Sequence, residues 1–108
     1  MQIINLTPHE VKIVLDNGGT IAVPPSGTVA RVTTTLTKQG YIDGIPVYVT
    51  EFGEVEGLPE PQADTIYIVS ALVLGAISRE RTDVYAPLTA KAVRDENGNI
   101  IGVPGLTR

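Results

Sequence analysis

The chain has 108 residues and a net charge of −4, and its arginines and lysines are scattered, so it has no basic run to capture duplex nucleic acid. The absence of cysteine excludes disulfides, thiolate nucleophiles and cysteine-ligated zinc. The length predicts a single domain over 1–108, with a thin core that must be aliphatic because aromatic residues are few.

The first half of the chain reads as strands joined by tight turns. Gln2 to Asn5 is a short apolar start, and 10–15 and 20–23 alternate around the turn "DNGG". After "PPSG" at 24–27, residues 28–37 favour a strand because they are rich in β-branched side chains. We expect a turn region at Lys38 to Tyr41, and another strand at 45–52 after the Asp43-Gly44 turn.

The second half begins with a loop at 53–65, which is rich in acids, prolines and glycines. "IYIV" at 66–69 is apolar on both faces, as in a central strand that is covered on both sides. Ser70 is a good N-cap for a short, mostly buried helix near residues 70–79. A strand at 84–86 and a hairpin at 91–103 follow. The fold class is therefore α+β: a mainly antiparallel sheet or partly open barrel, built from hairpins, with one short helix.

The closing hairpin "RDENGNIIG", 94–102, is compatible with two registers. A two-residue turn at Asn97-Gly98 pairs Arg94 with Ile101. A type I turn with a bulge at Gly98 instead pairs Val93 with Ile101 and leaves Asp95 beside Asn99. We prefer the second register because it matches the apolar residues better. Arg94 then shares a face with Ala92 and Ile100.

Few residues are suited to catalysis, and we expect no catalytic residue, metal or cofactor. His9 is the only histidine, and it is either a surface residue or a ligand contact. Ser70 at a helix start is either a plain N-cap or a phosphate contact. Asn5, Thr7 and Asp95 lie with them at strand ends, where loops build binding sites.

The arginines are the other candidates for ligand binding. Arg79 and Arg81 compensate the helix C-terminus and form surface ion pairs, or else one of them converges with Arg31 and Arg94 on an anionic ligand. The acidic loop offers the competing partners Glu54 and Glu56. The residues leave both interpretations open.

No stretch predicts membrane association. The N-terminal "MQIINLTPHE" lacks the pattern of a signal peptide, and the longest apolar run, 71–77, is far shorter than the ~20 residues that cross a bilayer. We expect a cytoplasmic protein. A homo-oligomer is expected as well, because the thin core and the apolar strand and helix leave more apolar surface than one small domain can hide.

Several segments occur in a characteristic order: "NLTPHEV", "PPSGTVARV", "FGEVEGLPEPQ", "YIVSALV" and "VRDENGNIIG". Together they resemble a family of small proteins encoded by phages and prophages, over nearly the whole chain. The resemblance implies a location in the host cell cytoplasm and a role against host defence. It implies no catalytic residue.

Three functions are compatible with this background. The first, which we favour, is sequestration of a small anionic, nucleotide-derived immune signal without catalysis, through Asn5, Thr7, His9, Arg31, Ser70, Arg79, Arg81, Arg94 and Asp95. The second is inhibition of a host defence enzyme by protein contact, as a direct blocker or in the manner of an anti-CRISPR protein. The third is a small enzyme that cleaves such a signal.

Overall fold

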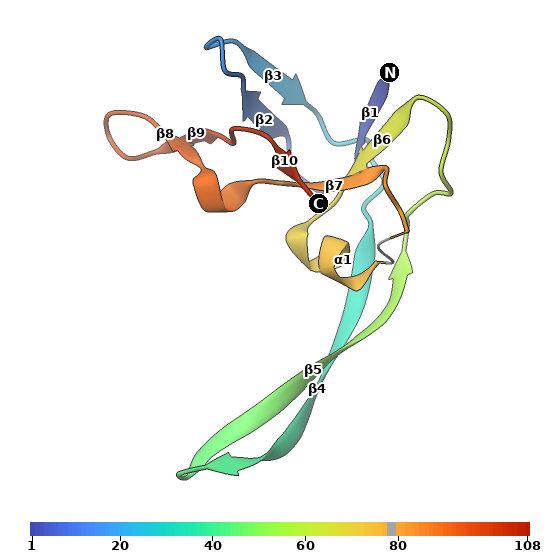
Figure 1. Cartoon of the computed structure of the whole chain (residues 1–108), viewed down its shortest axis with the longest axis vertical. Coiled ribbons are helices and arrows are strands. Elements are labelled where there is room, and N and C mark those ends of the chain that lie inside the picture. The colour runs from blue at the N-terminus through green and yellow to red at the C-terminus, as the bar shows by residue number, and fades with distance from the viewer. Residues whose placement is uncertain (78–79) are drawn as a thin grey trace.

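A computed structural model describes residues 1–77 and 80–108 of the chain, which form a β-rich fold with one α-helix among them (Figure 1). In chain order the elements are β1 (Gln2–Asn5), β2 (Val11–Val14), β3 (Thr20–Val23), β4 (Arg31–Ile42), β5 (Ile45–Glu56), β6 (Thr65–Ile68), α1 (Ala71–Ala76), β7 (Val84–Pro87), the 3-10 helix η1 (Thr89–Lys91), β8 (Val93–Arg94), β9 (Ile100–Gly102) and β10 (Leu106–Thr107). The mostly β class, with antiparallel hairpins, one short helix and an open sheet, is confirmed.

The centre of the molecule is a four-stranded sheet in the order β1-β6-β7-β10. β1 and β7 both run parallel to β6, and β10 is antiparallel to β7. The sheet is therefore mixed, while the hairpins around it, β2–β3, β4–β5 and β8–β9, are antiparallel. Parallel neighbours require a long connection, and the hairpins lie within these connections or after them.

The predicted central strand is confirmed, because Tyr67, Ile68 and Val69 have no exposed surface. Successive side chains of a strand point to opposite faces. Tyr67 and Val69 accordingly pack in one apolar cluster with Val73 of α1, whereas Ile68 packs in another with Val11 of β2. Both clusters are mainly aliphatic, as the composition predicts, so the sheet has a small core on each face.

The short helix forms where the sequence predicts it. Ser70 has extended backbone angles, and its Oγ accepts a hydrogen bond from the backbone N–H of Val73 at 3.3 Å, so it is the N-cap. The helix ends at Ala76, and its burial is less complete than expected: Val73 is buried but Leu72 is 51% exposed. No helix in the described part of the chain has the length and apolarity that crossing a membrane requires.

The hairpin β4–β5 extends far beyond the sheet, as Figure 1 shows, and we call it the arm. The turn expected at Lys38 to Tyr41 is wrong, because β4 continues through these residues to Ile42. The arm turns at Asp43-Gly44, where both residues have positive φ, as a two-residue hairpin turn of type I′ requires. The expected loop at 53–65 is likewise shorter, because β5 includes residues up to Glu56.

For the closing hairpin, the turn is predicted correctly, but the partner predicted for Val93 is wrong. The N–H of Gly98 donates to the Asp95 carbonyl and the N–H of Asp95 donates to Asn99, so the predicted bulged turn is confirmed. Arg94 pairs with Ile100, and the two share a face as expected. A second bulge then pairs Val93 with Gly102 instead of Ile101.

Candidate functional site

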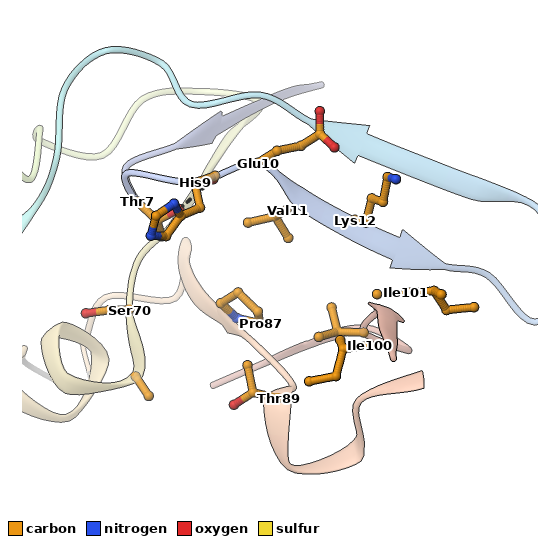
Figure 2. Close-up of a pocket in the computed structure, with 13 residues that line it drawn as sticks. Thr7, His9, Glu10, Val11, Lys12, Ser70, Pro87, Thr89, Ile100 and Ile101 are labelled. Carbon is orange, nitrogen blue, oxygen red and sulfur yellow. Dashed lines mark hydrogen bonds between the residues drawn. The ribbon is translucent and has the colours of Figure 1, made fainter. Parts of the chain in front are cut away.

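An open cleft of about 510 Å³ lies beside β2. Its lining comes from four parts of the chain: Thr7 to Lys12, the start of α1, the β7–η1 segment and β9. Figure 2 shows Val11, Pro87 and Ile100 around the cleft, with His9 and Ser70 at one end and Ile101 at the other. The walls are mainly apolar; Thr7, His9 and Ser70 lie at one end, and Thr89 lies near Pro87 and Ile100.

A buried asparagine shapes that polar end. Asn5, only 1% exposed, uses its Nδ2 to donate to the carbonyls of His9 at 2.8 Å and Val23 at 3.0 Å. Its Oδ1 accepts from the backbone N–H of Thr7 at 2.9 Å and from the Thr7 hydroxyl at 2.6 Å. Asn5 therefore makes all its hydrogen bonds within the chain. It holds the Thr7–His9 turn and is not itself open to a ligand.

Thr7, His9 and Ser70, which the sequence singles out, all line the cleft. Thr7 is buried and its hydroxyl also lies 3.0 Å from the His9 carbonyl, whereas the His9 and Ser70 residues are exposed. In the described chain no serine or threonine hydroxyl is hydrogen-bonded to the His9 imidazole. The group has the donors and acceptors to read a polar ligand but not the contacts of an activated nucleophile.

The far wall is fixed by backbone contacts between β2 and the closing hairpin. The N–H of Val103 donates to the Lys12 carbonyl at 2.9 Å, and the N–H of Val14 donates to the Val103 carbonyl at 2.8 Å. Gly102 makes this approach possible, because a Cβ there would lie 2.9 Å from the Lys12 oxygen. These bonds bring Ile100 and Ile101 to the cleft.

Glu10 and Lys12 belong to the lining of the cleft, but their side chains point away from it. In Figure 2 the side chains of Glu10, just before β2, and of Lys12 in β2 point away from Pro87, opposite to Val11. Arg94 does not line the cleft, but it is paired with Ile100 and leaves the hairpin on the same face. It is exposed and donates to the Gly98 carbonyl at 2.8 Å. Asp95 accepts two backbone hydrogen bonds within the same turn.

The other predicted arginines do not meet there. Arg31 is at the base of the arm, opposite Glu56, and Arg79 lies outside the described residues. Arg81 lines a second cavity of about 420 Å³ that neither Arg31 nor Arg94 reaches. The expected convergence of three arginines is therefore not found in either cavity.

Arg81 is engaged by a carboxylate, as the alternative interpretation expects, but the partner is Asp83. Its Nε and Nη2 donate to the two carboxylate oxygens at 2.9 and 3.0 Å, and Nη2 also donates to the Pro59 carbonyl at 3.0 Å. The hydrogen bond to Arg81 lowers the pKa of Asp83, against a smaller opposing effect of burial. The loop thus supplies a carbonyl to Arg81, and Glu54 and Glu56 do not contribute.

Sequence reasoning missed most of the apolar lining, notably Pro87, Ile100 and Ile101. The alternation of β2 indicated that Val11 faces inward, but no local signal shows that the closing hairpin packs across β2. In the described residues, no His, Asp and Glu side chains group closely enough to hold a metal ion. No family model, curated protein or solved structure matches the chain.

Proposed function

We propose that the protein binds a small nucleotide-derived ligand in the cleft beside β2 and releases it unchanged. The observation that carries the proposal is the cleft itself, an apolar space of about 510 Å³ with Thr7, His9 and Ser70 at one end. Ligand sites typically measure roughly 300–1,000 Å³ and combine apolar walls with a few polar groups that orient the ligand.

The arrangement favours a particular orientation of the ligand. A nucleobase is flat, with apolar ring faces and polar edges, so its faces could pack against Val11, Pro87 and Ile100 with one edge toward His9 and Ser70. Anionic phosphates would extend past Ile100 toward Arg94, its partner in the closing hairpin. An arginine there can form charge-assisted, bidentate bonds to phosphate.

The hydrogen bonds of the Ser70 and Thr7 hydroxyls support binding without turnover. The Ser70 hydroxyl accepts the helix-capping bond from Val73, and the Thr7 hydroxyl contacts Asn5 and the His9 carbonyl. Neither is activated by a neighbouring base, which nucleophilic catalysis requires. Together with the resemblance to phage-encoded proteins, this supports sequestration of a host immune signal in the host cytoplasm.

The test is a thermal-shift screen of the purified protein against cyclic dinucleotides, cyclic trinucleotides and ADP-ribose-derived signals. We expect one class to raise the melting temperature, and chromatography of the ligand released by heating to recover it intact. A panel without any stabilising compound would refute the sequestration hypothesis. A ligand recovered in altered form would mean that the protein is an enzyme.

A further inference from the structure

The arm exposes most of its large apolar side chains. In the described chain these are Leu36, Tyr41, Ile42, Ile45, Tyr48, Val49 and Phe52, which are between 38% and 66% exposed. Only the base of the arm contributes to the core, through Val32 and Val55. Contiguous apolar patches larger than a few hundred Å² are rare on monomers and mark interaction sites.

The strand register assigns these residues to two faces, because directly paired residues lie on the same face of a ribbon. One face carries the pairs Thr34–Phe52, Leu36–Thr50, Lys38–Tyr48 and Tyr41–Pro46. The other carries Thr35–Glu51, Thr37–Val49, Gly40–Val47 and Ile42–Ile45. We call the first the aromatic face. It holds Tyr41, Tyr48 and Phe52, three of the aromatic residues in a chain that has four Tyr, one Phe and no Trp.

Among these pairs Lys38 is the one charged residue of the aromatic face, and its position is compatible with burial of this face in an interface. Lys38 Nζ lies 3.2 Å from the Tyr41 hydroxyl, and 5.3 and 5.9 Å from the ring centres of Tyr41 and Tyr48. A lysine can bury its aliphatic stem against rings while its ammonium group stays in water. The face therefore has the aromatic-rich, charge-poor composition of an interface core.

The molecule exposes more surface than is typical of a compact folded monomer of the same mass. Its accessible surface is 7503 Å², whereas a folded monomer of this mass exposes roughly 5,800 Å². The difference, roughly 1,700 Å², exceeds the ~800 Å² that each partner buries in a typical stable interface. The radius of gyration is likewise large, 16.7 Å against roughly 13 Å for a compact domain of this length.

An arm that projects from the sheet would gain stability from packing against a partner. A two-stranded ribbon is marginally stable in water unless it packs against something else. The one partner that is present whenever the chain is present is another copy of it. We propose that the protein is a homodimer whose arms pack with their aromatic faces against each other around a two-fold axis. Such an interface is self-complementary, so the same Leu36, Tyr48 and Phe52 cover their counterparts.

The first test measures mass by light scattering at tens of micromolar, with two matched leucine variants. Leu36→Lys places a charge on the aromatic face, and Leu72→Lys places one at a similarly exposed position of α1. We expect a dimer for the native chain and for Leu72→Lys, and at least a tenfold weaker dimer for Leu36→Lys. A monomeric native chain, an unchanged Leu36→Lys dimer or dissociation by Leu72→Lys would each overturn the proposal.

The second test requires only mild substitutions, so it is informative even if Leu36→Lys fails to fold. The native chain lacks cysteine, and Thr50→Cys and Thr37→Cys place one thiol on the aromatic face and on the opposite face, respectively. A short bismaleimide should link Thr50→Cys into covalent dimers much faster than Thr37→Cys. Equal linking, or faster linking through Thr37→Cys, would show that the aromatic faces are not in contact.

Discussion

The side-chain oxygen of Asn5 lies 2.6 Å from the hydroxyl oxygen of Thr7 and accepts its hydrogen bond within the buried part of the chain. The same asparagine also fixes the His9 carbonyl. One side chain thus joins the end of β1 to the turn that forms the polar end of the cleft.

Asn5→Ala should lower the free energy of unfolding by about 3 kcal/mol, because buried groups that it now satisfies would lose their partner. Chemical denaturation measures the change. Asn17→Ala is the control, since Asn17 makes an exposed hydrogen bond to Gly19 and should cost less than about 1 kcal/mol. Equal effects of the two variants would contradict the role that we assign to Asn5.

Gly102→Ala should destabilise the fold by roughly 1–3 kcal/mol, because the new methyl group would meet the Lys12 carbonyl at 2.9 Å and a Val14 methyl at 3.1 Å. Moving β9 away from β2 would also open the cleft and weaken ligand binding. Gly105→Ala is the matched control, because its Cβ would meet nothing within 4 Å. Denaturation curves of both variants measure the free energy of unfolding. A Gly102→Ala variant as stable as the native chain would contradict the close approach of β9 to β2.

The Arg81–Asp83 pair predicts a stability change in acid. Because Arg81 lowers the pKa of Asp83 below its ordinary value of 3.8, the unfolded chain binds this proton at higher pH than the folded chain does. The stabilisation is therefore fully present above about pH 4 and is lost as the pH falls through the folded-state pKa.

Denaturation at several pH values should show this acid-dependent loss in the native chain and a smaller one in Asp83→Asn. Asp64→Asn should leave the profile nearly unchanged, because Asp64 is exposed and lies 3.9 Å from the N-terminal amine. An acid profile that Asp83→Asn does not alter would show that the pair contributes nothing.

Two arginine variants test the orientation of the ligand. Once a stabilising compound is found, Arg94→Ala should weaken its binding by roughly 10- to 150-fold, the effect of losing a charged hydrogen bond of ~1.5–3 kcal/mol. Arg31→Ala, at the base of the arm, should not change the affinity. Calorimetric titration measures both, with circular dichroism as the check on folding. An unchanged affinity of the Arg94→Ala variant would show that Arg94 does not contact the ligand.

Local chemistry made much of the fold predictable. Two turns and one helix cap form as expected, because turns and caps depend on a few adjacent residues. They are the turns at Asp43-Gly44 and Asp95 to Gly98 and the cap at Ser70. The central strand was recognisable because every side chain of "IYIV" is apolar. These signals need no knowledge of distant partners.

The errors concern contacts between distant segments. No turn forms at Lys38 to Tyr41, because β5 continues to pair with β4 through these residues. The cleft depends on bonds from Val103 to β2, and the parallel pairing of β1 depends on residues 65–68. The candidate arginines were linked because they lie on or beside apolar faces of the predicted strands and helix, and of the described ones only Arg81 lines a cavity described above.

The parallel pairing of β1 with β6 has a consequence for how the chain acquires its fold. Gln2 pairs with Thr65, so β1 has no neighbouring strand in the four-stranded sheet until the segment that contains β6 has been made. The β2–β3 and β4–β5 hairpins are local and can form earlier, since closing a short loop costs less entropy. During synthesis β1 therefore joins the sheet only when β6 is complete, after both of these hairpins have been made.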